Sequence, residues 1–188
     1  MLKTGLEDEG FTQNKVDPCI VLRRKFIVIC YVDYCCILSK DQETIDALLQ
    51  NLSKIFELTN EEDVKSYLDM NVRKDPNGTI TMRQPEMTEK ILNSLVICDE
   101  SKAHDTPENF ILARYEYGNG RKQEWHYCSV IGQINYLAGT TRTAILFYMY
   151  QCAKYSTNQK KTHEEFVKMI GHYLKKTKDK GLVFTPDG

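Results

Sequence analysis

Three short apolar runs, separated by polar breaks, dominate the first forty residues. They lie at residues 19–22, 26–32 and 35–38 and are rich in β-branched and aromatic residues, which predicts strands rather than helices. Because the second and third runs are almost continuously apolar, we expect central strands that are covered on both faces. A tight turn at Asp33 and Tyr34 joins them and leaves one acidic residue at the tip.

Helical periodicity begins after Asp41, which is expected to cap a helix that covers the sheet. The apolar stripe of this helix comprises Ile45, Leu48, Leu49, Leu52 and Phe56. A second hairpin is predicted around the proline and glycine of residues 75–78. A short helix from about residue 85 to residue 95 follows it.

The second half of the chain is mainly helical in pattern. Residues 98–122 are polar and irregular, which predicts a linker. Largely buried helices are expected at 127–136 and 142–155, and a last helix opens with the capping-box pattern Thr162-His-Glu-Glu165 and stops at Gly181. The predicted fold class is therefore α+β, with subdomains at residues 1–97 and 123–188.

Composition narrows the class of protein. Apolar residues make up 41% of the chain, enough for a buried core, and a formal net charge of −1 argues against a uniformly basic nucleic-acid coat. The longest apolar run is far shorter than a membrane span, and the first residues lack an apolar signal segment. We expect a soluble intracellular chain, cytoplasmic or nuclear, without a membrane partner.

Seven cysteines are present, with no C-x-x-C pair, so a structural zinc site is not indicated. Cysteines inside apolar runs are expected to be reduced core residues. The four histidines are scattered and are interpreted as surface or capping residues. Trp125 and Tyr127 are interpreted as core anchors rather than base-stacking residues.

Basic charge is concentrated near the C-terminus. Residues 154–180 contain eight lysines and three acidic residues, a local balance of +5 that leaves −6 for the rest of the chain. A candidate cluster for phosphate oxygens comprises Lys160, Lys161, Lys168, Lys175 and Lys176. A solvated helix face explains the same composition equally well.

The tip sequence Tyr31-Val-Asp33-Tyr34 is the most informative motif. Taken alone, Asp33 is a turn former. A turn of the form Tyr-x-Asp-Asp between two apolar strands is, however, the signature of the reverse-transcriptase palm, and this chain resembles it up to the last position. Tyr34 stands where the second aspartate is expected.

The resemblance continues along most of the chain, in the order found in reverse transcriptases of copia-type LTR retrotransposons. Matching residues are Gly10-Phe11, Asp17-Pro-Cys-Ile20, Leu38-Ser-Lys40, Phe56-Glu-Leu-Thr59, Tyr67-Leu68, Gln84-Pro85, Thr106-Pro107, the segment from Tyr127 to Leu137, Thr141-Arg142, His163, Val167-Lys168, Tyr173-Leu-Lys175, Thr177 and Gly181-Leu182. The chain departs from the family pattern at Tyr34, Asp69, Cys128, Thr143 and Ala144. The resemblance implies part of a palm over residues 1–97 and a thumb-like or connection-like part over residues 123–188.

Polymerisation in this family uses two Mg²⁺ ions held by three carboxylates. Of these, the resemblance assigns Asp33 to this chain and places another, with the fingers, upstream of Met1. Asp33 alone makes a weak and incomplete metal site, because Tyr34 offers only a neutral phenol. We therefore expect a truncated RNA-directed DNA polymerase that is inactive alone and binds Mg²⁺ poorly.

Two alternatives remain open. In the first, the chain is a non-catalytic module that binds the backbone of an RNA or DNA template-primer through its lysines. Otherwise it joins an upstream polymerase half and restores an active enzyme, although the substitution at Tyr34 counts against this.

Overall fold

The computed structural model confirms the α+β class and divides into two compact units, residues Met1–Tyr67 and Leu68–Gly188. The chain is described over residues 2–32, 34–61, 64–98, 100–107, 112–114, 117–122 and 124–186. Residues 68–97, which the hydropathy pattern groups with the first subdomain, lie within the second unit.

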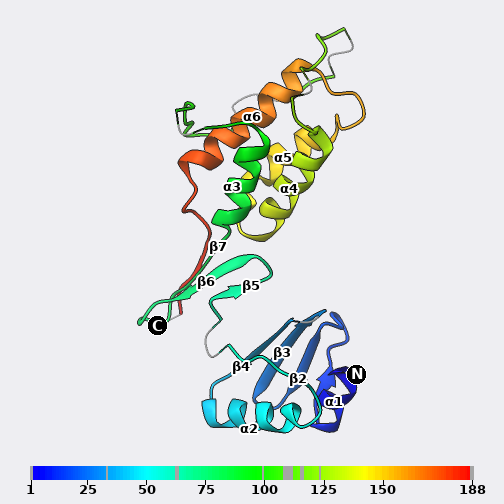
Figure 1. Ribbon diagram of the computed structural model, residues 1–188, viewed down its shortest axis with the longest axis vertical. Coiled ribbons are helices and arrows are strands. Elements are labelled where there is room, and N and C mark those ends of the chain that lie inside the picture. Colours follow the sequence, from blue (N-terminus) through cyan, green and yellow to red (C-terminus); the bar gives the residue numbers. More distant parts are fainter. Residues whose placement is uncertain are drawn as a thin grey trace. The chain divides into compact units, whose positions relative to one another are not determined.

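The first unit is a small antiparallel sheet with two helices on one face (Figure 1). The strands follow the order β1-β2-β3-β4, and their bounds are β1 Thr12–Gln13, β2 Ile20–Arg23, β3 Phe26–Tyr31 and β4 Tyr34–Ser39. Helices α1 (Leu2–Asp8) and α2 (Gln42–Ser53) supply Leu6, Leu48 and Leu52 to the core. A two-residue strand, β5 (Ser66–Tyr67), ends the unit.

Alternation along β3 corrects the prediction of strands covered on both faces. Phe26 and Val28 are buried beneath α1 and α2, whereas Ile27 and its register partner Leu38 are 44% and 45% exposed. Strand β4 lies at the edge of the sheet. The nearly continuous apolar run is misleading because one face of this antiparallel sheet carries apolar residues without being buried.

The second unit combines an antiparallel sheet with a helical bundle (Figure 1). Strands β6 (Met70–Lys74) and β7 (Ile80–Arg83) form the predicted hairpin, and β8 (Leu182–Phe184), which the pattern does not predict, pairs with β7. The helices are α3 (Pro85–Ser94), α4 (Tyr127–Thr140), the 3₁₀ turn η1 (Thr143–Ile145), α5 (Leu146–Ala153) and α6 (Lys161–Lys176).

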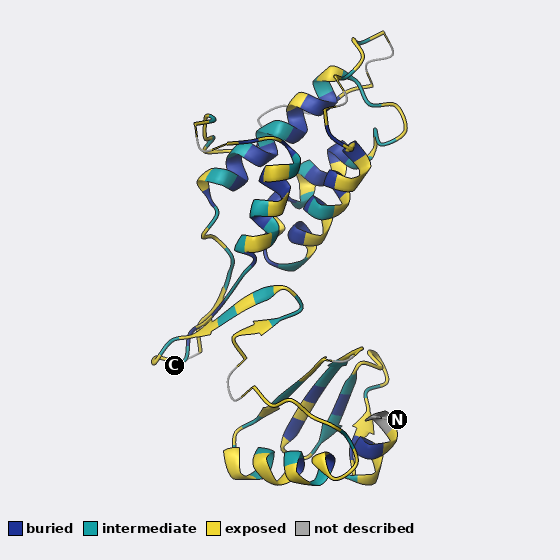
Figure 2. Cartoon of the chain, viewed as in Figure 1, coloured by how far each residue is buried: buried dark blue, intermediate teal, exposed yellow. Residues whose placement is uncertain are grey.

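The bundle holds the larger core of the molecule. Buried residues of α3, α4, α5 and α6 belong to one hydrophobic cluster, and Figure 2 colours the buried residues of these helices dark blue. Helix α6 is strongly amphipathic: Phe166, Val167, Ile170 and Leu174 are fully buried. Helix α5 is less buried than its apolar composition predicts, since Phe147 and Tyr150 are more than half exposed.

The predicted linker lies against the bundle where it is described. Leu112 is buried, the backbone N–H of Lys161 donates to the carbonyl of Asn119, and that of His104 donates to the carbonyl of His172. The described parts of residues 98–122 are thus irregular in structure but packed along α6.

Candidate functional site

The β3–β4 hairpin carries the motif that resembles the polymerase palm. Tyr31 and Tyr34 are register partners, which leaves two residues for the reversal. Val32 has a φ of 51°, a left-handed conformation that strains a β-branched residue. Both tyrosines are exposed, Tyr31 by 54% and Tyr34 by 65%. Asp33, the predicted catalytic and metal-binding residue, lies outside the described residues.

The described side chains do not fit a magnesium site. Within the described ranges, no group of three His, Cys, Asp or Glu side chains is placed to hold a metal ion. Tyr34 begins β4 with an exposed phenol, and magnesium selects carboxylate and water oxygens in near-octahedral geometry.

Two thiols lie directly behind the hairpin tip. Cys30 and Cys35 are cross-strand partners, and the Cys35 thiol contacts the sulfur of Cys30 at 3.3 Å. Partial burial, with the neighbouring Cys30 thiol, raises the pKa of Cys35 to about 12. Cys152 is buried, as expected of a core cysteine, but Cys35 is exposed, which corrects the prediction that cysteines in apolar runs are core residues.

The five predicted phosphate-binding lysines lie at and along α6. Lys160 precedes the helix, and Lys161, Lys168 and Lys175 follow at intervals of seven residues, which places them on one face. The structure gives each of these three a partner. Lys161 pairs with Glu165 at 3.6 Å and Lys168 with Glu124 at 3.3 Å, while Lys175 donates to the carbonyls of Cys98 and Ser101.

Lys176, the last predicted lysine, forms an ion pair with Asp105. This contact holds the pKa of the Asp105 carboxyl below its usual value. The structure thus brings three of the five lysines onto one stripe of α6 and interleaves the cluster with carboxylates.

His163 caps α6, as the sequence analysis of the histidines expects. Its Nδ1 accepts the backbone N–H of Lys160 at 3.0 Å, and its ring stacks on Tyr155 with centroids 4.2 Å apart. The helix begins at Lys161, so the predicted capping box at residues 162–165 is displaced by two residues. His163, rather than a glutamate, supplies the acceptor for the backbone.

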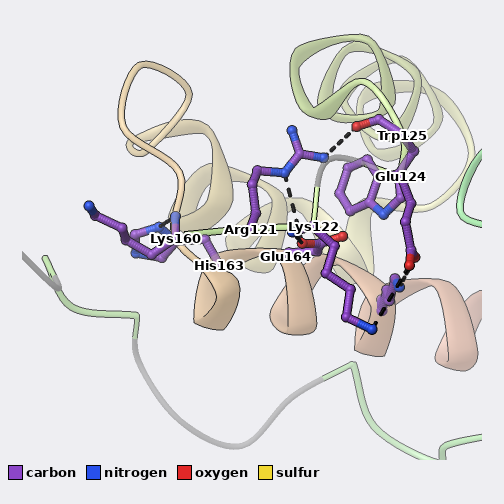
Figure 3. Close-up of polar contacts among 8 residues, drawn as sticks. Arg121, Lys122, Glu124, Trp125, Lys160, His163 and Glu164 are labelled. Carbon is purple, nitrogen blue, oxygen red and sulfur yellow. Dashed lines mark hydrogen bonds and ion pairs between the residues drawn. The ribbon is translucent and has the colours of Figure 1, made fainter. Parts of the chain in front are cut away.

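A buried charged cluster, which the sequence pattern does not predict, joins Arg121 and Lys122 to the start of α6 (Figure 3). Glu164 accepts the backbone N–H of Lys122 at 3.1 Å and lies 3.9 Å from Arg121 Nε. The Arg121 guanidinium also donates to the carbonyl of Trp125 and lies 4.7 Å from the centroid of its ring. Trp125 is buried and stacked on Tyr127, which confirms that these two aromatics anchor the core.

Several residues that carry the family resemblance hold the bundle together. The Gln84 side-chain carbonyl accepts the hydroxyl of Thr141 at 2.8 Å, and both residues are 2% exposed. Arg142 is 4% exposed and donates to the carbonyl and the hydroxyl of Thr177 at the end of α6. These contacts give the matched positions a structural role in the second unit.

Among the described residues, no helix combines the length and the apolarity that crossing a membrane requires.

The chain is similar to a transposon Pol polyprotein. The chain is 25% identical, over 191 aligned residues, to the "Retrovirus-related Pol polyprotein from transposon TNT 1-94" of Nicotiana tabacum. The alignment covers 95% of this chain and 14% of the polyprotein, so the chain spans about one seventh of the length of that relative. No family model and no solved structure matches. The similarity supports an origin of this chain in a retrotransposon Pol polyprotein.

Proposed function

We propose that this chain corresponds to the palm hairpin and the following helical part of a copia-type reverse transcriptase, and that it does not extend a primer by itself. The observation that carries the proposal is the pairing of Tyr31 with Tyr34 at the tip of the β3–β4 hairpin, the position at which the resemblance expects the Tyr-x-Asp-Asp turn. Similarity to a retrotransposon Pol polyprotein along 95% of the chain supports the same ancestry.

Tyr34 is the reason to expect no activity from this chain alone. Phosphoryl transfer in such a site depends on carboxylates that hold two metal ions beside the primer hydroxyl and the triphosphate. A phenol is neutral at pH 7 and is a poor ligand for Mg²⁺, so the exposed Tyr34 cannot replace the aspartate that the resemblance places there.

Primer extension on a primed RNA template, with Mg²⁺ or Mn²⁺, tests both parts of the proposal. The samples are the chain, its Tyr34→Asp variant and its Tyr31→Asp variant, each with and without the relative's segment that precedes the aligned region. Only Tyr34→Asp with the preceding segment is expected to extend the primer. Tyr31→Asp is the matched control, because it adds the same carboxylate to the other exposed tyrosine of the register pair.

Primer extension by the unsubstituted chain alone would overturn the proposal that this chain is inactive by itself. If the complemented Tyr34→Asp sample extends no better than complemented Tyr31→Asp, position 34 does not correspond to the second aspartate, and the assignment of the hairpin fails.

A second candidate function is binding of a nucleic-acid backbone without catalysis. The seven-residue spacing of Lys161, Lys168 and Lys175 favours it, because it aligns three cations about 10 Å apart along one face of α6. The carboxylates that contact Lys161 and Lys168 are about half exposed, and such surface pairs are weak enough for phosphate to displace them.

Salt dependence tests this second candidate. The affinity for duplex RNA or DNA should fall with salt, and replacing Lys161 and Lys168 by alanine should reduce the slope of log K against log [salt] by roughly two. Lys54→Ala, a lysine of the first unit, is the control and should leave the slope unchanged. If replacing Lys161 and Lys168 leaves the slope of log K against log [salt] unchanged, this stripe of α6 is not the contact surface.

A further inference from the structure

The hairpin that carries the polymerase-like turn also carries a pair of facing thiols. Cys30 on β3 and Cys35 on β4 are register partners, and their sulfur atoms lie 3.3 Å apart. Side chains alternate between the two faces of a strand, so Cys36 points away from this pair. Cys30 and Cys35 share the sheet face of Val28 and Ile37, at the end of the core nearest the tip.

Hydrogen bonding in the sheet shows which kind of cross-strand position this is. The backbone N–H of Cys30 donates to the carbonyl of Cys19 on the other side of β3, at 2.8 Å, and therefore does not point at β4. Cys30 and Cys35 thus form a non-hydrogen-bonded pair, whose Cα atoms are typically about 4.5 Å apart. This separation falls within the range of disulfides, and the sulfurs need to approach by only about 1.3 Å to reach bonding distance.

We propose that Cys30 and Cys35 form a reversible redox-modification site, which a low-molecular-weight disulfide such as oxidised glutathione converts to a cross-strand disulfide. The exposed Cys35 is the point of entry. Its thiolate attacks the oxidant, forms a mixed disulfide and releases one equivalent of the reduced thiol; because the pKa of Cys35 is raised, this step is slow at neutral pH and faster at alkaline pH. Cys30 then attacks the Cys35 sulfur and releases the second equivalent. The protein loses two electrons and two protons, and the oxidant gains both.

The bond would close a ring immediately behind the turn. Cys30 precedes Tyr31 and Cys35 follows Tyr34, so the ring contains both exposed tyrosines and the two residues of the reversal. Oxidation therefore restricts the conformation of the segment that the proposed function assigns to the polymerase tip. The proposed dithiol site depends only on the register of β3 and β4. It does not depend on descent of the chain from a polymerase.

Oxidation of the full-length native chain with glutathione disulfide, followed by mass spectrometry, tests the site. We expect a species lighter by about 2 Da, the mass of the two hydrogens lost, which returns to the starting mass on addition of dithiothreitol. Alkylation before digestion with chymotrypsin shows which thiols remain free. Cys36 should carry the alkyl group, and Cys30 and Cys35 should be joined.

The same oxidation in urea supplies the control for chain proximity. Cys35 and Cys36 are almost equally distant from Cys30 in the sequence, so the unfolded chain should form both bonds in comparable amounts. The folded chain should favour the bond to Cys35 by at least about tenfold, because only that thiol shares the face of Cys30. Cys36→Ser should oxidise as the unsubstituted chain does, whereas Cys35→Ser should yield no intramolecular bond at Cys30.

Three results would overturn the proposal: a Cys30–Cys36 bond in the folded chain in amounts comparable to Cys30–Cys35, stable mixed disulfides with glutathione at Cys35, or no reaction at Cys30 under conditions that modify the exposed Cys19. The first result would mean that the β3–β4 register is wrong. The other two would mean that the thiols do not approach closely enough to close the bond.

Discussion

At the scale of single residues, Glu164 is a buried carboxylate that depends on its polar partners. Its side chain is 4% exposed and lies against Arg121, whose side chain is 9% exposed. Glu164→Ala would remove the acceptor of the Lys122 N–H and leave a buried guanidinium without its carboxylate. We expect the free energy of unfolding to fall by about 3 kcal/mol, measured by urea denaturation.

Glu165→Ala is the matched control for this prediction. Glu165 is adjacent in the sequence, exposed, and paired with Lys161 on the surface of α6, so its removal should change the stability by less than about 0.5 kcal/mol. Equal losses from the two substitutions would show that Glu164 is not buried against Arg121.

Burial of Trp125 could be anticipated from the sequence, but burial of Glu164 could not. An aromatic residue that precedes an apolar helix commonly packs in the core. A glutamate near the start of a helix is ordinarily an exposed capping residue, and the sequence gives no sign that Arg121, more than forty residues earlier, is its partner. The capping role itself belongs to His163, two positions earlier than the pattern predicts a glutamate.

At the scale of elements, Arg142 links the end of α4 to the end of α6. It donates to Thr177 through two guanidinium nitrogens, and its guanidinium carbon lies 5.5 Å from the centroid of the Tyr173 ring. Arg142→Lys retains the charge but cannot make both contacts in the same plane. We expect a loss of about 2 kcal/mol in thermal or urea denaturation.

Arg73→Lys provides the corresponding surface substitution. Arg73 contacts Asp75 at 3.1 Å with two thirds of its side chain exposed, so exchange for lysine should have almost no effect on stability. If both lysine variants are as stable as the unsubstituted chain, the buried arginine does not tie α4 to α6.

Gly181 permits the close approach of β8 to β7. A Cβ at this position would lie 2.1 Å from the Met82 carbonyl oxygen and 2.8 Å from Arg83 Cγ. Gly181→Ala should therefore displace β8, lower the stability by about 2 kcal/mol and speed hydrogen exchange at the amides of Ile80 and Met82.

Gly120→Ala controls for the general effect of replacing a glycine, since nothing lies within 4 Å of the added Cβ. The variant should remain within about 0.5 kcal/mol of the unsubstituted chain. Unchanged exchange in Gly181→Ala would mean that β8 does not pair with β7 as described.

Elements with a strong periodic pattern could be predicted, and elements that depend on distant partners could not. The stripe of α2, the turn between β6 and β7 and the helix after Pro85 all follow from local sequence. Strand β8 is three residues long and pairs with a strand about a hundred residues earlier, which no local pattern records. The exposure of one face of β3 could not be predicted either, because the sequence of an apolar strand does not show whether another layer covers that face.

At the scale of the whole molecule, the compact units divide at Tyr67 and Leu68, whereas the sequence predicts breaks at residues 97 and 122. The apolar residues of α3 explain the difference. Ile91 and Leu95 are buried in the same core as Ile134, Ile170 and Leu174, so α3 belongs to the bundle. Hydropathy shows that α3 has an apolar face but does not show which partner covers it.

Separate expression of the two units tests this division. The fragment Leu68–Gly188 retains the whole core of the bundle, including α3, and should show a cooperative thermal transition and a helical circular dichroism spectrum. Among the described residues of the fragment Met1–Tyr67, seven form a small buried core, and at this size domains are marginal, so the fragment should unfold at a lower temperature. A fragment that starts at residue 98, the boundary expected from composition, would lack α3 and expose Ile134 and Ile170, so it should lose the cooperative transition. Equal cooperativity in the fragments starting at residues 68 and 98 would instead place α3 outside the folding unit.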